Sequence, residues 1–121
     1  MEEFYTKIFV DAKIELTDLI EHVREVVGGI LSIDTVLTNS LELDVKRNDL
    51  GLSSSYSGDE FLTYRYTVEV VSVIDIELGE YLEEVSKIMI SLSELGFSVV
   101  AACDWEEQLP GRGRLCSYSH S

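Results

Sequence analysis

The sequence predicts an α+β domain with a ferredoxin-like βαββαβ fold, in which two helices pack on one face of a mainly antiparallel sheet. Three kinds of segment support this prediction. Some stretches alternate apolar and polar residues, two stretches repeat apolar residues every three or four positions, and one short stretch is almost entirely apolar. Their order along the chain is strand, helix, strand, strand, helix, strand.

The first half of the chain contains a strand, a helix and a second strand region. Residues 4–11 alternate in the manner of a strand, and residues 16–27 carry a continuous apolar stripe that ends at a pair of glycines, typical of a helix. Residues 31–46 alternate again but change phase near Asn39. We therefore expect there either one long strand with a bulge or two short strands.

The second half begins with a loop and continues with three regular elements. Residues 47–60 are rich in Asn, Asp, Gly and Ser, which predicts a loop. Residues 61–74 alternate as the clearest strand, and residues 78–95 form a second helical stripe before Gly96. The apolar run at residues 97–103 has the length of a strand.

The predicted fold places the last strand, residues 97–103, at an edge of the sheet, although this segment is the most apolar in the chain. An extra strand, the C-terminal tail or a second copy of the chain would bury it, so a homodimer is one of three explanations. Residues 1–110 are expected to form one domain. Residues 111–121 are expected to form a polar, flexible tail.

The charge is the most unusual feature of the composition. The 121 residues include 23 acidic and 9 basic side chains, a formal charge of −14, and 45% of the residues are hydrophobic, which indicates a folded domain. All the acids and seven of the basic residues fall in residues 1–110, giving that part −16. Such a field repels nucleic acid and anionic membranes and attracts a basic macromolecule. The alternative is that the charge serves solubility alone.

The N-terminal stretch, the lengths of the apolar runs and the positions of the two cysteines indicate the compartment and the redox state of the thiols. It begins with an acidic stretch, and no apolar run is long enough for a membrane span, so we expect a cytoplasmic protein. Cys103 follows an apolar run and Cys116 lies in the tail. We expect both thiols to be free, because disulfides are rare in a reducing compartment.

The common catalytic signatures are missing from the sequence. It has no glycine-rich phosphate loop, no G-x-S-x-G, no H-E-x-x-H and no C-x-x-C. His22 lies on the polar face of the first predicted helix, and His120 is next to the last residue. Cys116 and His120 alone are too few ligands for a metal site. We therefore expect no enzyme activity, no metal and no cofactor.

Three acidic residues flank one tryptophan where the last strand ends: Asp104, Trp105, Glu106 and Glu107. The cluster could be a metal site, an acid/base pair or a protein-binding patch. A binding patch requires the fewest special features, because Trp is enriched at interfaces and carboxylates pair with Arg or Lys. The alternative is that Trp105 caps the core while the acids face water.

A second candidate surface surrounds the strand at residues 61–74. Asp59 and Glu60 precede it, and Tyr64 and Tyr66 lie on its more apolar side, which we expect to be core. The opposite face then has mixed charge and includes Asp44. We take Asp59, Glu60 and Asp44 as further partner-binding candidates.

Two segments carry a resemblance to a known group of proteins: GDEFLTYRYTVEV at residues 58–70 and VVAACDWEEQLP at residues 99–110. Together they resemble small acidic bacterial immunity proteins of polymorphic toxin systems. The resemblance implies that the chain binds and neutralises one cognate basic toxin, commonly a nuclease, without chemistry of its own. The competing hypothesis is a small-molecule-sensing regulatory domain, since folds of this kind often bind ligands.

Overall fold

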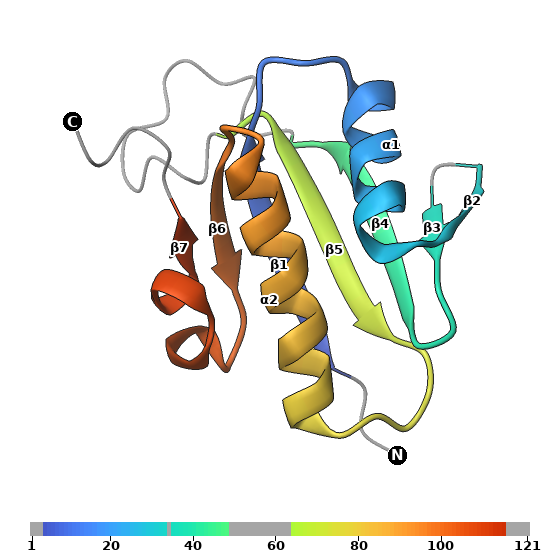
Figure 1. The fold of residues 1–121 in the computed structure, drawn as a ribbon, viewed down its shortest axis with the longest axis vertical. Coiled ribbons are helices and arrows are strands. Elements are labelled where there is room, and N and C mark those ends of the chain that lie inside the picture. Colours follow the sequence, from blue (N-terminus) through green and yellow to red (C-terminus); the bar gives the residue numbers. More distant parts are fainter. Residues whose placement is uncertain (1–3, 34, 49–63, 116–121) are drawn as a thin grey trace.

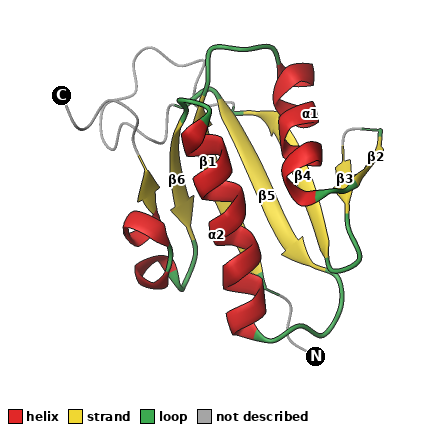
Figure 2. Cartoon of the chain, viewed as in Figure 1, coloured by secondary structure: helices red, strands yellow, loops and turns green. Residues whose placement is uncertain are grey.

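The computed structural model describes residues 4–33, 35–48 and 64–115. Within them the chain is an α+β structure with two α-helices and one antiparallel sheet (Figures 1 and 2). The elements in chain order are β1 (Tyr5–Asp11), α1 (Leu16–Val27), β2 (Ile30–Ser32), β3 (Thr35–Leu37), β4 (Leu41–Arg47), β5 (Tyr66–Ser72), α2 (Leu78–Glu94), β6 (Ser98–Ala102), the 3₁₀ turns η3 (Glu106–Gln108) and η4 (Pro110–Gly113), and β7 (Arg114–Leu115).

The sheet has seven strands in the order β2-β3-β4-β5-β1-β6-β7, and every neighbouring pair is antiparallel. Strands β1 and β5 are central, as predicted, with Ile8 opposite Val68 on one side and Ala101 on the other. The α+β class, the two helices and the antiparallel sheet are confirmed. The strict six-element ferredoxin-like βαββαβ plan is wrong, because the sheet contains additional strands on both sides.

The first difference lies in residues 31–46, where the chain reverses twice and forms β2, β3 and β4. Both expectations, one bulged strand or two short strands, are therefore wrong. Ile33 takes a left-handed conformation, with φ of 59°, after β2. At the second reversal the Thr38 hydroxyl accepts hydrogen bonds from the backbone N–H groups of Ser40 (3.2 Å) and Leu41 (2.9 Å). The change of phase near Asn39 marks a tight turn, which short polar side chains stabilise.

The second difference is β7, which pairs with the edge of β6. Val99 lies opposite Leu115 and Val100 lies opposite Arg114. Gly113 permits this approach, since it has φ of 89° and an added Cβ would lie 3.1 Å from the carbonyl oxygen of Ala101. The extra strand covers part of the apolar edge that the sequence left unexplained. The ordered sheet thus extends to Leu115, into the segment expected to be a tail.

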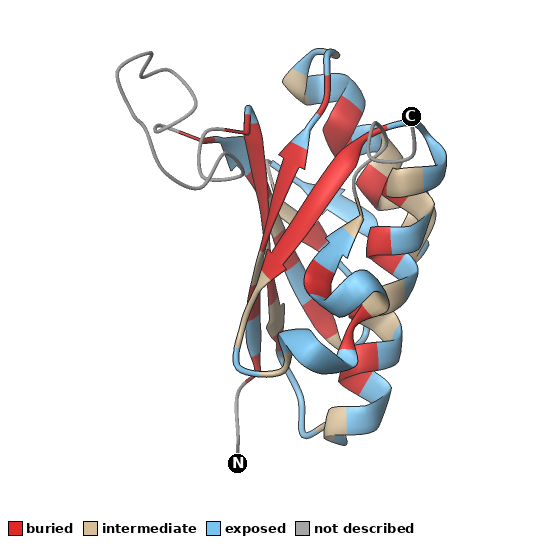
Figure 3. Ribbon diagram, turned by 90° about the vertical axis from the view of Figure 1, so that its left-hand side faces the viewer, coloured by how far each residue is buried: buried red, intermediate tan, exposed pale blue. Residues whose placement is uncertain are grey.

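Both helices cover the same face of the sheet (Figure 3). The main core lies between the layers and is formed by the inward side chains of the strands with Leu19, Val23, Val85 and Ile88 of the helices. Helix α1 ends as predicted, at Gly28 with φ of 65°, a conformation that favours glycine. No described helix is long and apolar enough to cross a membrane.

Tyr64 and Tyr66 are both buried, as predicted, but they belong to different clusters. Tyr66 lies in the main core and its hydroxyl donates to the carbonyl oxygen of Ile14. Tyr64 packs with Phe9 and Val100 on the opposite face of the sheet. The chain bends at Arg65, before β5 begins, and this bend breaks the simple alternation between the two tyrosines.

Candidate functional site

The predicted strand-end cluster lies where β6 leaves the sheet and the chain enters η3. The side chains of Asp104, Glu106 and Glu107 are exposed, while Trp105 is half-buried. Glu106 also has a local role, since its Oε2 accepts a hydrogen bond from the backbone N–H of Cys103 at 3.3 Å. The segment therefore presents carboxylates to solvent, one of which also holds the turn.

The Trp105 ring packs against the rim of the main core. Its centroid lies 5.3 Å from that of Phe4 in an edge-to-face arrangement and 6.4 Å from that of Tyr81. Edge-to-face aromatic pairs contribute about 0.5–1.5 kcal/mol beyond the area that they bury. This geometry matches the alternative in which Trp105 caps the core and the neighbouring acids face water.

Asp44 lies on β4, on the face of the sheet opposite the helices. Its Oδ1 accepts a hydrogen bond of 2.7 Å from the Thr35 hydroxyl. Glu69 lies directly across on β5, and its Oε2 is 3.0 Å from Lys46 Nζ. Lys46 donates a hydrogen bond to Glu69, and this interaction raises the pKa of Lys46. This face therefore has mixed charge, as predicted.

The structure does not bring the predicted acidic residues together in one place. Strands β5 and β1 separate β4, which carries Asp44, from β6, which leads into the strand-end cluster. Adjacent strands lie about 4.8 Å apart, so the two positions cannot share one small site. Asp59 and Glu60 lie outside the described residues.

The layer formed by the helices carries a much larger acidic surface. Residues 13–28 and 73–96 contain ten carboxylates and three cations, an excess of seven negative charges. We call the exposed side of these two segments the acidic helix layer. Its members are Glu15, Asp18, Glu21, Glu25, Asp75, Glu77, Glu80, Glu83, Glu84 and Glu94.

Two of the three cations in the acidic helix layer pair with carboxylates of the same helix. Arg24 pairs with Glu21, and its hydrogen bond lowers the pKa of that carboxyl group. Lys87 Nζ lies 3.7 Å from Glu84 Oε2. Both pairs are largely exposed, and exposed pairs contribute little to stability. The pairs leave the net charge of the layer at seven negative, because all three cations are already counted in it.

None of these ten acids was among the candidate binding residues predicted from the sequence. A signal was nevertheless available, since the polar positions of both predicted helices are mostly Asp and Glu. The sequence alone does not show that both helices pack on the same face of the sheet (Figure 3). Because they do, the charges of the two helices add into one field.

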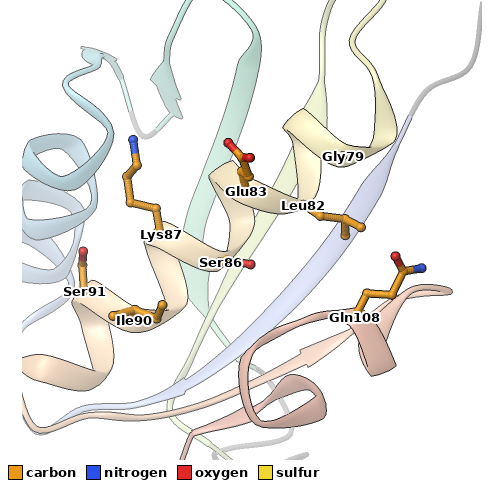
Figure 4. Close-up of a pocket in the computed structure, with 8 residues that line it drawn as sticks. All are labelled: Gly79, Leu82, Glu83, Ser86, Lys87, Ile90, Ser91 and Gln108. Atoms are coloured by element: carbon orange, nitrogen blue, oxygen red, sulfur yellow. The ribbon is translucent and has the colours of Figure 1, made fainter.

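A shallow cavity of about 520 Å³ lies along the outer side of α2. Seven of its lining residues come from this one helix, and Gln108 of η3 faces them from across the gap (Figure 4). Small-molecule sites usually enclose most of the ligand surface between several elements. A hollow walled by one helix and one glutamine gives a sensing function little support.

Among residues 4–33, 35–48 and 64–115, no three His, Cys, Asp or Glu side chains lie close enough to hold a metal ion. Comparisons of the chain with protein-family models, with curated proteins and with solved structures gave no match.

Proposed function

We propose that this protein is a non-catalytic binding domain that neutralises a basic protein toxin by covering its positive surface. The observation that carries the proposal is the acidic helix layer, with ten carboxylates against three cations on one side of the molecule. Complementary potentials of this kind accelerate encounter and select for a partner of opposite charge.

The distribution of charge supports a directed interaction better than a general solubility role. Solubility is served by acids spread over the whole surface. Here the opposite face of the sheet has mixed charge, where Lys46 contacts Glu69 and Lys7 lies over the Phe9 ring at 5.3 Å. Among residues 4–33, 35–48 and 64–115, the two helix segments contain ten acids and three cations, whereas the rest contains seven acids and six cations, so the excess of acid in the described part lies on the helix side.

A toxin is proposed as the partner because of the resemblance of residues 58–70 and 99–110 to immunity proteins. A nuclease toxin must have a basic cleft to hold nucleic acid, and an acidic domain can occupy that cleft without chemistry of its own. In this proposal the protein acts in the cytoplasm, where such a toxin would meet its target.

Co-expression with the product of the adjacent gene tests the proposal. We expect that product to be toxic alone, to be tolerated when this chain is present, and to co-purify with it. The complex should weaken about tenfold or more between 50 and 500 mM NaCl, because salt screens exposed charges. The proposal is wrong if the neighbouring product is harmless, or if this chain neither protects the cell nor co-purifies.

A further inference from the structure

Two adjoining hollows lie at the end of the molecule where α1 ends and α2 begins. The turn before β4 and the segment that leads into α2, which help to line them, are at the lower right of Figure 1. One has a volume of about 380 Å³ and lies between the turn before β4, residues 74–77 and the first turns of α2. The other has a volume of about 290 Å³ and lies between the end of α1 and the β2–β3 hairpin. Ser40 and Glu84 line both, so we treat them together as the acidic groove.

The walls of the acidic groove are held by main-chain hydrogen bonds. The Val73 N–H donates to the carbonyl oxygen of Ser40 at 2.9 Å, which ties the segment after β5 to the turn before β4. The Thr38 N–H donates to the carbonyl oxygen of Leu41 at 2.9 Å and closes that turn. A surface whose shape is fixed before binding loses less entropy when a partner docks.

The acidic groove contains five carboxylates, and no cation is among its described lining residues. The carboxylates are Asp75, Glu77, Glu80, Glu83 and Glu84. Part of this charge has a local explanation, because acidic side chains near a helix N-terminus are stabilised by the helix dipole. Charge alone therefore does not require a partner here.

The second observation is that large apolar side chains are exposed in the same groove. Ile30 is 74% exposed, Ile74 is 46% exposed and Leu37 is 39% exposed, and all three line it. Exposed apolar residues that gather inside a polar rim are typical of interaction sites. The combination of aliphatic and carboxylate side chains matches a ligand that is both apolar and positively charged.

The negative charge of the acidic groove distinguishes between its possible binding partners. A second copy of the chain in a symmetric dimer would place the same five carboxylates opposite each other. Nucleic acid and anionic membrane surfaces would be repelled by the same field. A protein segment rich in Lys or Arg, with aliphatic residues on one side, satisfies both the carboxylates and the isoleucines.

We propose that the acidic groove binds a cationic amphipathic segment of a partner protein. This inference rests on the proposed function, and it names the place on the acidic helix layer and the chemistry of the contact. The cationic side chains pair with the carboxylates from the first turns of α2. The aliphatic side chains cover Ile30 and Ile74, which removes apolar surface from water.

An NMR titration of the ¹⁵N-labelled full chain tests the groove without knowledge of the partner. The probe is a synthetic amphipathic Lys/Leu peptide of about 18 residues, five helical turns. A scrambled peptide of the same composition serves as the control. We expect saturable shifts confined to residues 27–40 and 73–84, and weaker binding of the scrambled peptide.

Matched variants separate the groove from the general field. Ile30→Ser combined with Ile74→Ser should weaken peptide binding about tenfold. Ile90→Ser, on an isoleucine outside the groove that is about as exposed as Ile74, should change binding less than twofold. Glu80→Gln with Glu84→Gln should also weaken binding about tenfold. Asp18→Asn with Glu94→Gln, which removes the same charge elsewhere on the acidic helix layer, should have little effect.

Three results would overturn the inference: shifts spread evenly over both helices, control variants that weaken binding as much as the groove variants, or no saturable binding. The proposed function is tested separately by co-expression with the adjacent gene. A protective, co-purifying chain that fails the peptide titration would retain the proposed function and lose the groove as its site.

Discussion

Tyr81 connects α2 to the middle of the sheet. Its hydroxyl donates to the carbonyl oxygen of Val70 at 2.9 Å, and the Thr6 hydroxyl lies 2.8 Å away in the same buried network. Burial raises the pKa of Tyr81 to about 12, although its hydrogen bond with Thr6 acts in the opposite direction. The side chain thus contributes both apolar area and paired polar groups to the core.

Replacing Tyr81 by Phe should lower the free energy of unfolding by about 1–2 kcal/mol at pH 7, because buried polar groups of Val70 and Thr6 lose a partner. The folded pKa of Tyr81 lies above its unfolded value of about 10. Its protonated state therefore stabilises the fold fully below pH 10, and this contribution is lost as the pH rises from about 10 to 12. Urea unfolding across that range should show a shallower loss for Tyr81→Phe than for the unchanged chain; an identical pH dependence would contradict the assignment.

Ile33 is the residue whose backbone fits its side chain least well. It is 89% exposed and has φ of 59°, a conformation that β-branched residues rarely adopt. Ile33→Asn should raise the free energy of unfolding by about 1 kcal/mol, because Asn tolerates the left-handed region. Ile33→Val, which keeps the branched side chain, should leave it unchanged within about 0.3 kcal/mol. Equal stability of the Asn and Val variants in chemical denaturation would show that the position carries no strain.

Residue patterns predicted burial well where one periodicity ran through a whole element. The alternation in residues 4–11 predicted a strand with Ile8 and Val10 on the same side, and both residues lie in the main core. In residues 61–74 the alternation correctly predicted that Tyr64 is buried, but it did not predict that Tyr64 packs on the face of the sheet opposite Tyr66, because the bend at Arg65 interrupts the strand. The role of Trp105 was left open by the sequence, since only the fold brings Phe4 and Tyr81 beside it.

At the scale of elements, the bounds of the helices were predicted closely, because their stripes end at glycines with positive φ. The additional strands were not. Strands β2, β3 and β7 have only two or three residues each, too few to show a period. Their existence depends on pairing with neighbours that are distant in the sequence or reversed by tight turns.

The β2–β3 hairpin meets α1 at Gly29, where the fold leaves no room for a side chain. An added Cβ would lie 2.7 Å from the carbonyl oxygen of Leu37 and 2.8 Å from Val36 Cγ1. Gly29→Ala should therefore lower the free energy of unfolding by about 2 kcal/mol or more, as measured by thermal or chemical denaturation.

Gly79→Ala is the matched control for that substitution. An added Cβ at Gly79 would meet nothing within 4 Å, and the residue lies in the first turn of α2. Alanine there should stabilise the helix by up to about 1 kcal/mol. The packing of the hairpin against α1 would be in doubt if the two substitutions changed stability in the same direction.

At the scale of the whole molecule, composition predicted the sign of the field but not its direction. The formal charge of −14 predicted a negative field, whereas the acidic helix layer arises because α1 and α2 pack on one face of the sheet. The strand-end cluster at residues 104–107 was predicted as a binding site because its acids are contiguous in the sequence. The larger acidic surface was harder to see because its members are separated along two helices.

The central claim is that the acidic helix layer contacts the toxin. Two variants that remove the same charge from different parts of the surface test it most directly. One variant combines Asp75→Asn, Glu80→Gln and Glu83→Gln on the acidic helix layer. The other combines Glu42→Gln, Asp104→Asn and Glu107→Gln on the opposite face and the strand end. Both remove three negative charges from exposed positions.

The measurement is the Kd of each variant for the toxic product of the adjacent gene, at 150 mM NaCl by calorimetry. The helix-layer variant should bind about tenfold more weakly than the unchanged chain, while the second variant should stay within about twofold. If the second variant lost binding while the helix-layer variant bound as tightly as the unchanged chain, the claim would be contradicted. The contact would then lie on the opposite face or at the strand end.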